Sequence, residues 1–213
     1  MSVEPVLADV TDSAELKAAI EALTRVPLFS TINIIVNNAA GPIMGTDRQI
    51  LWDDARWQSA INVKAVGALR IIRECLPFLA TDGTGRILNI TGASGIAVSG
   101  QALLHGMNNA ALMQMTSYMA ADLATAKVTV NAIVPGVVGT ETRQAWAENM
   151  GREKGLPPME AIADYCRGRG VLSARWAEVR EIADLAVFLA SDRAQFINGA
   201  RIPIDGGFST HTR

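Results

Sequence analysis

Short apolar runs alternate along the chain with longer segments in which apolar residues recur at a helical period. Runs rich in β-branched residues predict strands, and strands that alternate with helices are typical of βα units feeding a parallel sheet. The predicted strands are Val3–Asp9, Ile32–Asn37, Arg86–Ile90, Val128–Val134 and Ala200–Ile204. Most of them are apolar nearly throughout, which predicts an α/β fold with helices on both faces of the sheet.

Helical periodicity fills the intervals between these strands. The predicted helices begin near Ser13 and near Asp53, and run over about Leu104–Ala126 and about Glu178–Leu189. Asp12 is the expected N-cap of the first helix, because its carboxylate can accept the free amides of the first turn. The segment 139–170 has a weaker pattern and predicts two short helices on an excursion over the sheet. No repeat or linker interrupts the chain, so residues 1–213 are interpreted as a single domain.

Composition and charge exclude several classes of protein. Of the 213 residues 49% are hydrophobic, and 19 basic against 21 acidic residues give a net charge of −2. Without a basic stripe, neither nucleic acid nor a membrane surface is an expected partner. The apolar runs are too short to span a membrane and no secretory signal pattern is present, so we expect a cytoplasmic protein. Cys75 and Cys166 lack the spacing of a zinc site, and no metal is predicted.

Polar or glycine-containing segments follow most of the predicted strands. They are Asp9, Asn37–Gly41, Thr91–Gly95 and Pro135–Thr140. In parallel α/β sheets ligands bind beyond the carboxyl ends of the strands. The chemistry of this chain is therefore expected at these four strand ends.

The motifs at the strand ends resemble, in order and spacing, those of the short-chain dehydrogenase/reductase family. The segments that carry the resemblance are Asp9–Asp12, Asn37–Ala40, Ile61–Val63, Pro135–Thr140, Phe188–Asp192, Asn198–Gly199 and Asp205–Gly207. Ala40 stands where the family's Asn-Asn-Ala-Gly motif has its glycine. The resemblance implies a Rossmann-like, doubly wound parallel sheet flanked by helices, and an oxidoreductase family whose cofactor is NAD or NADP.

The resemblance also implies which positions would contact that cofactor. They are Asp9, Val10, Asn37, Ala39, Pro135, Gly136 and Thr140. For some of these residues a structural role is the preferred interpretation: Asp9 is expected to cap the turn before the first helix, and Asn37 to tie strand ends together. The same holds for the hydroxyls of Thr91 and Ser94, because hydroxyls are common after such a strand.

The part of the fold that would hold the cofactor pyrophosphate is not found. The family's Gly-x-x-x-Gly-x-Gly turn places backbone amides and a helix N-terminus around the phosphates. No such triplet occurs in the sequence. The chain begins at what resembles the third strand of the family, so the first βαβα unit is expected to be lacking. Met1 favours a genuine start, with a fragment or a misplaced start as the alternative.

The catalytic positions of the family are also replaced. In the family a serine polarises the substrate carbonyl, a tyrosine transfers the proton, and a lysine four residues on lowers the tyrosine pKa. Alignment places Gly92 at the serine, His105 at the tyrosine and Asn109 at the lysine, whereas Asn62 matches the family's asparagine. Neither tyrosine of the chain is followed four residues later by lysine. The sequence therefore predicts that the chain alone neither binds NAD or NADP nor transfers hydride.

Three functions remain open on these residues. The leading interpretation is a non-catalytic subunit that pairs with itself or with a catalytically complete relative. The second is a cofactor-independent dehydratase, isomerase or cyclase in which His105, oriented by Asn62 and Asn109, acts as general base. The third is an NAD(P)-dependent oxidoreductase whose sequence is truncated here. For His105, drift is preferred over catalysis: once tyrosine and lysine are lost, the position changes without gaining a new function. No carboxylate is placed by the sequence to form a catalytic dyad with it.

The missing strands also raise a question of sheet geometry. In the resembled family two strands separate those that match Val3–Asp9 and Ile32–Asn37. Without them the flank of Ile32–Asn37 is unpaired, and exposed edges invite aggregation. We predict that Val3–Asp9 pairs directly and in parallel with Ile32–Asn37 through a right-handed crossover, giving five strands in chain order. The alternative is that another chain covers the flank.

Overall fold

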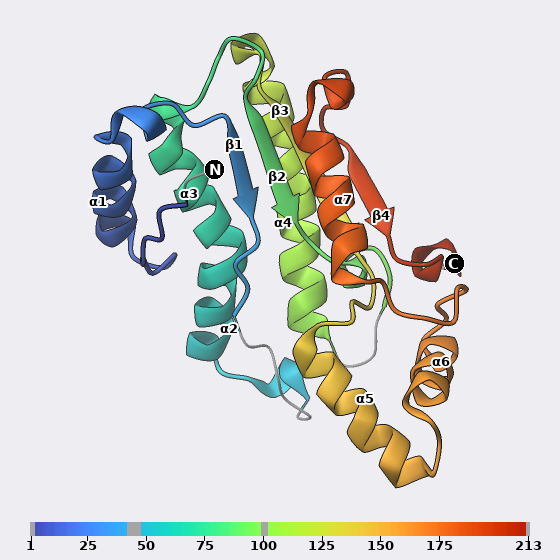
Figure 1. The fold of residues 1–213 in the computed structure, drawn as a ribbon. Helices are drawn as coiled ribbons and strands as arrows, with labels where there is room; N and C mark the ends of the chain where they lie inside the picture. The colour runs from blue at the N-terminus through green and yellow to red at the C-terminus, as the bar shows by residue number, and fades with distance from the viewer. Residues whose placement is uncertain (1–2, 42–47, 99–101, 212–213) are drawn as a thin grey trace.

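The computed structural model describes residues 3–41, 48–98 and 102–211, and its strands form one parallel sheet (Figure 1). The strands are β1 (Ile34–Asn37), β2 (Arg86–Ile90), β3 (Thr129–Pro135) and β4 (Arg201–Ile204). They lie in chain order with every neighbouring pair parallel, and Ile35 is in register with Ile87. The predicted α/β class is confirmed, as are four of the predicted strands with slightly shifted ends.

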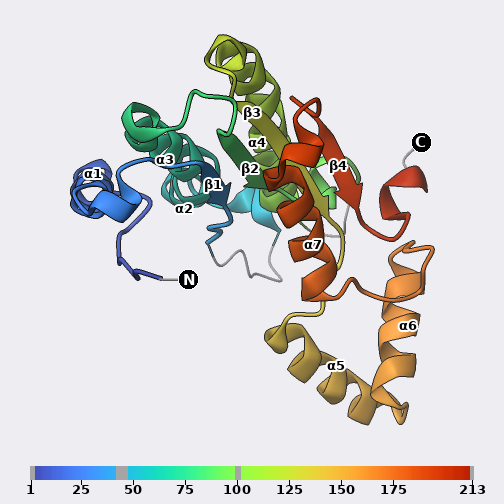
Figure 2. The same ribbon diagram turned by 45° about the horizontal axis from the view of Figure 1, so that its top comes forward.

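Helices cover both faces of this sheet (Figures 1 and 2). The helices are α1 (Ser13–Thr24), α2 (Asp54–Ile61), α3 (Gly67–Cys75), α4 (Leu103–Asp122), α5 (Glu141–Lys154), α6 (Pro158–Gly168) and α7 (Val179–Ala190). Between α2 and α3 the chain forms a short π-helix, η3 (Asn62–Val66). Helices α3 and α4 pack on one face of the sheet and α7 packs on the other, while α1 lies against α3. α2, η3 and α3 follow one another without a break, because Asn62, Val66 and Gly67 all keep right-handed helical backbone.

Short 3-10 turns join many of these elements. They are η1 (Pro27–Phe29), η2 (Gln49–Leu51), η4 (Leu76–Phe78), η5 (Ala93–Gly95), η6 (Ala124–Ala126), η7 (Asp192–Ala194) and η8 (Phe208–His211). Capping side chains define several helix starts. The carboxylate of Asp12 accepts the backbone N–H groups of Ala14 at 2.8 Å and Glu15 at 3.0 Å, so the predicted N-cap of α1 is confirmed. Glu178 and Glu181 form a capping box at the start of α7.

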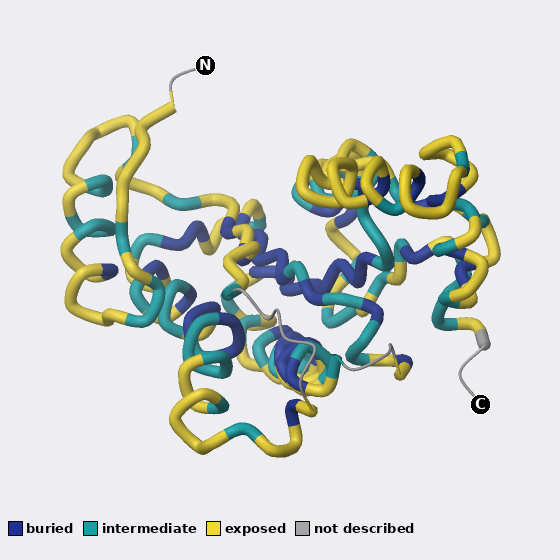
Figure 3. Tube along the Cα trace, turned by 90° about the horizontal axis from the view of Figure 1, so that it is seen from below, coloured by how far each residue is buried: buried dark blue, intermediate teal, exposed yellow. Residues whose placement is uncertain are grey.

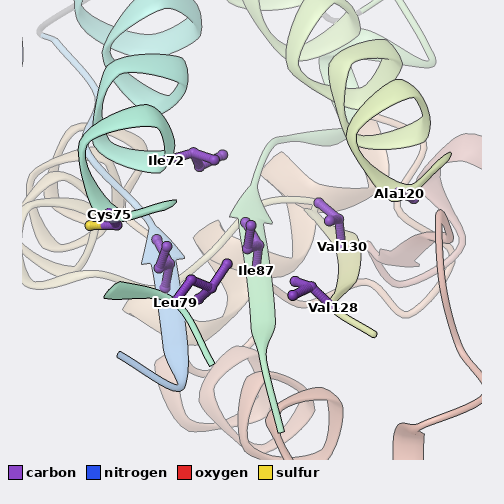
Figure 4. Packing of buried hydrophobic residues seen from close by; sticks show 8 residues of the cluster. Ile72, Cys75, Leu79, Ile87, Ala120, Val128 and Val130 are labelled. Carbon is purple, nitrogen blue, oxygen red and sulfur yellow. The ribbon is translucent and has the colours of Figure 1, made fainter. Parts of the chain in front are cut away.

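The core is divided by the sheet into two apolar layers. Beneath α3 and α4, Ile72, Ile87 and Val130 belong to one buried cluster (Figure 4). On the α7 side, Leu88 and its neighbours pack against Leu189. Because successive residues of a strand point to opposite faces, β2 supplies Ile87 to one layer and Leu88 to the other. Buried residues run through the middle of the trace, and the helices at its sides are exposed over much of their surface (Figure 3).

The five-stranded sheet predicted from the sequence is wrong. Val3–Asp9 forms no strand, and β1 is an edge strand in the described part of the chain. Its outer side chains, Ile34 and Val36, are 47% and 49% exposed. The segment that was expected to pair with this edge is itself exposed, with Leu7 almost fully in solvent.

Contacts with α3 explain why the N-terminal segment does not reach β1. The guanidinium of Arg70 donates from Nη1 to the carbonyl of Val10 at 3.2 Å, and Arg73 donates to Ser13 Oγ at 3.2 Å. Val10 also packs closely against Gly67, where a Cβ would lie 3.2 Å from its methyl group. These bonds hold the start of α1 on the outer side of α3. Held there, the N-terminal segment does not pair with β1.

The excursion predicted over residues 139–170 is confirmed as α5 and α6, which lie beyond the carboxyl ends of β3 and β4 (Figure 1). The two helices enclose a small apolar cluster of their own, built around Ile162, Cys166 and Trp176.

Within the described ranges, no helix combines the length and the apolar composition needed to cross a membrane.

Candidate functional site

A cavity of about 360 Å³ opens where β2 and β3 end, beneath α5 and α6. Its position agrees with the expectation that ligands bind beyond the carboxyl ends of parallel strands. The polar and charged residues that line it are Lys64, Thr91, Ser94, His105, Asn109, Thr140, Arg143, Tyr165 and Arg169. Gly92, Pro135 and Gly136 also line it, so the structure brings together eight of the residues singled out in the sequence.

The side chain of Asn109 lies directly over Gly92 in this cavity. A Cβ built on Gly92 would lie 2.7 Å from Nδ2 of Asn109, which is closer than unbonded atoms approach. The amide of Asn109 donates from Nδ2 to Ser94 Oγ at 2.9 Å. Its buried Oδ1 has no partner among the described residues. The side chain of Asn109 therefore fills the place into which a side chain at position 92 would project.

His105 lines the cavity from the first turn of α4 and is half-buried. The two asparagines expected to orient it are engaged elsewhere: the Asn62 side-chain oxygen accepts from Arg70 at 2.5 Å, and Asn109 bonds to Ser94. No bond between His105 and another described residue is present, so that expectation is wrong. Burial lowers the pKa of His105, and the nearby positive charges of Lys64 and Arg143 lower it further.

Lys64 is a buried cation that the sequence reasoning missed. It lies on η3, is only 7% exposed, and donates from Nζ to the carbonyl oxygen of Thr91 at 3.3 Å. Burial lowers its pKa to about 8, because a charged ammonium loses hydration there. The signal that could have found it is a lysine within the apolar stretch that continues into α3, at a position on the buried side of the helix.

The outer wall of the cavity is supplied by α5 and the end of α6. Arg143 donates from Nη1 to the hydroxyl of Tyr165 at 3.2 Å. The guanidinium of Arg169 lies 5.7 Å from the centroid of the same ring. The sequence did not identify these three residues, since the segment 139–170 carries no diagnostic motif, and only the fold of α5 and α6 brings them to the strand ends.

The cofactor-contact positions implied by the resemblance divide into two groups. Pro135, Gly136 and Thr140 line the cavity, and Gly136 is tightly enclosed because a Cβ there would lie 2.7 Å from the backbone of Asp205. The remaining positions, Asp9, Val10, Asn37 and Ala39, do not line it.

Most of the structural roles preferred from the sequence are confirmed. The Asp9 carboxylate accepts from the backbone N–H and the hydroxyl of Thr11, both at 2.8 Å, which closes the turn before α1. Asn37 donates to the side chain of Asn89 at 2.8 Å and so ties β1 to β2, although through a side chain and not through backbone. Thr91 donates to the carbonyl oxygen of Ile133 at 3.0 Å.

In the described ranges, no three His, Cys, Asp or Glu residues gather into a metal site.

Comparisons with known proteins agree with this fold. The family profile described as enoyl-(acyl carrier protein) reductase matches residues 1–209. The uncharacterized oxidoreductase YvrD of Bacillus subtilis is 31% identical over 202 residues, which are 94% of this chain and 75% of the relative. A short-chain dehydrogenase/reductase from Burkholderia xenovorans is 30% identical, with a TM-score of 0.83 over 100% of this chain and 77% of that one.

A further solved structure has a title that names its ligands. The gluconate 5-dehydrogenase of Burkholderia cenocepacia, in complex with NADP and tartrate, is 25% identical, with a TM-score of 0.80 over 96% of this chain and 74% of that one. The sheet, its helices and the cavity at the strand ends define a Rossmann-like α/β protein. The extent of the profile match then identifies the chain as a member of the short-chain dehydrogenase/reductase family, a family of oxidoreductases.

Proposed function

We propose that this chain is a family subunit that does not transfer hydride by itself and acts in an assembly with a second copy or with a catalytically complete relative. The observation that carries the proposal is the pair Gly92 and Asn109, together with His105. These residues stand at the positions of the family's serine, lysine and tyrosine. Glycine at position 92 and asparagine at position 109 supply neither the hydroxyl nor the lysine charge that the family's residues there would bring to a carbonyl.

The described residues also fit a nicotinamide dinucleotide poorly. The glycine-rich turn that would hold a pyrophosphate is not present in the 213 residues. Asn109 has no positive charge with which to hold a ribose. One carboxylate oxygen of Asp9 already accepts both hydrogen bonds from Thr11. NADP binding by the relative from Burkholderia cenocepacia therefore does not extend to this chain alone.

Exposed apolar side chains support assembly. Tyr118 on α4 is exposed, as are Val187 on α7 and Phe196 in the loop before β4. The outer side chains of β1 add a further exposed apolar strip. Association with another chain would remove such surface from water, which is favourable. A cytoplasmic location is part of this proposal.

Native purification followed by mass spectrometry tests the assembly, and calorimetric titration with NADH and NADPH tests the chain alone. We expect a homo-oligomer or a stable complex with a complete relative, and no saturable binding of either nucleotide to the isolated chain. A monomer at working concentration would contradict the assembly. Full-stoichiometry binding with a dissociation constant of about micromolar order would contradict the loss of the cofactor.

A second candidate function rests on the contents of the cavity. It holds two ionisable groups, His105 and Lys64, whose pKa values are both lowered, that of Lys64 to about 8. Such groups suit proton transfer in a cofactor-independent dehydration, isomerisation or cyclisation, with His105 as general base. If this function is correct, His105→Phe lowers turnover of the native substrate by about 10²-fold or more without changing folding. If drift is correct, the same substitution alters only stability or assembly.

A further inference from the structure

The cavity is basic although the protein as a whole is slightly acidic. Lys64, His105, Arg143 and Arg169 line it, and no carboxylate is found among the described residues of its wall. The complete chain has a net charge of −2. A concave site lined by charges of one sign concentrates ligands of the opposite sign. The distribution of charge, and not its total, therefore sets this cavity apart.

Lys64 has donors that its protein contacts do not use. An ammonium group has three N–H donors, and the bond to the Thr91 carbonyl oxygen uses one of them at the long distance of 3.3 Å. Lys64 forms no ion pair with a described residue. Burying a cation without a counter-charge is unfavourable, and an anion in the cavity would remove much of that cost.

Arg143 stands at the exposed side of the same cavity. Its bond to the Tyr165 hydroxyl uses one of the five N–H donors of a guanidinium. Both Arg143 and Lys64 lie close enough to His105 to lower the pKa of its ring. The cavity thus places a buried ammonium and a more exposed guanidinium around one imidazole, and each has donors left for an oxyanion.

We propose that this cavity binds a small organic oxyanion, a carboxylate or a phosphate, between the Lys64 ammonium and the Arg143 guanidinium and next to the His105 ring. A volume of about 360 Å³ lies at the lower end of the range of small-molecule sites. Planar guanidinium donors match the oxygens of either group. The site goes beyond the proposed function, since it requires neither a dinucleotide nor a partner chain.

Titration with three probes at constant ionic strength tests the site. The probes are butyrate, butyramide as its neutral counterpart of the same shape, and inorganic phosphate. Binding is followed by the NMR signal of the His105 ring, assigned by its loss in His105→Asn. We expect saturable binding of butyrate or phosphate in about the millimolar range, a raised His105 pKa in the bound state, and no saturable effect of butyramide.

The relative effects of the two anions distinguish the ligand classes. Stronger binding of butyrate identifies a carboxylate site, and stronger binding of phosphate identifies a phosphate site. Equal binding of butyrate and butyramide would overturn the proposal, because it would show recognition of the apolar part alone. Absence of saturable binding by both anions would overturn it as well.

Matched variants show whether the named cations hold the anion. Lys64→Met and Arg143→Gln are each expected to weaken binding about tenfold, since each removes a charged donor. Arg152→Gln is the control on the same helix, because Arg152 does not line the cavity and bonds to Asn149. An Arg152 variant that weakens binding as much as the other two would overturn the assignment. Binding of NADH or NADPH would contradict the proposed function and leave this site intact.

Discussion

Two buried cations at opposite ends of the sheet differ in how they are satisfied. Arg86 begins β2 and is 1% exposed. Its Nη1 donates to the carbonyl oxygens of Gly83 at 2.8 Å and Gly85 at 2.9 Å, and its Nη2 lies 3.4 Å from the Asp192 carboxylate. Lys64 lies at the carboxyl end of the sheet with one long bond to a carbonyl. A cation with several partners stabilises the fold, whereas one with donors to spare is suited to a ligand.

The largest effect is expected for Arg86→Met. The substitution removes the donors that satisfy two carbonyl oxygens at the amino end of the sheet and breaks the contact with Asp192. Breaking a buried pair costs about 3–5 kcal/mol, and the lower end applies because the Asp192 side chain is 79% exposed. Urea unfolding at pH 7 measures the loss. A variant as stable as the wild type would show that Arg86 does not stabilise the fold.

The opposite sign is expected for Lys64→Met, which removes a cation that burial disfavours. The pKa falls from 10.5 in the unfolded chain to about 8 in the fold, so the unfolded state binds more protons between these values. The resulting penalty is fully present below pH 8, decreases as pH rises to 10.5, and is absent above it. At pH 7 the variant is expected to be more stable by up to about 3 kcal/mol.

Urea unfolding of both proteins from pH 7 to pH 10.5 measures this difference. Subtracting the two curves removes the contributions of groups that both proteins share, such as Cys75, whose pKa burial raises to about 11. A constant stability difference across this range would contradict a depressed Lys64 pKa. A destabilised variant at pH 7 would show that Lys64 is as well satisfied as Arg86.

A smaller effect is expected where the Asn109 side chain packs against Gly92 in the cavity wall. Gly92→Ser would place a side chain against the Asn109 amide and should cost about 1–3 kcal/mol through overpacking. Asn109→Ala makes room, so the double variant should recover part of the loss. A double-mutant cycle from chemical unfolding gives the coupling. Additive effects of the two substitutions would mean that Asn109 does not occupy the space above Gly92.

The smallest effect is expected for Asp192→Asn, which tests what holds Arg86. If the carbonyl oxygens satisfy most of the guanidinium, loss of an exposed carboxylate at 3.4 Å should cost about 0.5 kcal/mol. Thermal unfolding in low and high salt measures it. A cost close to that of Arg86→Met would assign the stability of this end of the sheet to the ion pair.

Much of the fold was predictable because it follows from local patterns. Apolar β-branched runs mark β2 and β3, which are buried on both faces, and side-chain capping marks the start of α1. The error at Val3–Asp9 has the same origin. An apolar run indicates that a segment favours an extended form, but pairing with β1 depends on where α3 and Arg70 hold the neighbouring residues.

The candidate site was predictable only where a motif marks it. Gly92, His105 and Asn109 were located by their spacing, and the structure does place them in one cavity. Lys64 and Arg143 were missed, because a lysine in a helix and an arginine in a segment without a motif are ordinary features of a sequence. Their shared position arises from η3 and α5, which meet at the strand ends.

The sequence by itself determined the α/β class, the chain order of the four strands and the family resemblance. Each of these depends on residue identity, on spacing or on contacts between neighbours in the chain. Only the tertiary structure decided that β1 has an exposed flank, that Asn109 fills the space above Gly92 and that four basic side chains share one cavity. Burial, charge density and unused donors depend on which distant segments meet, and no local pattern encodes that.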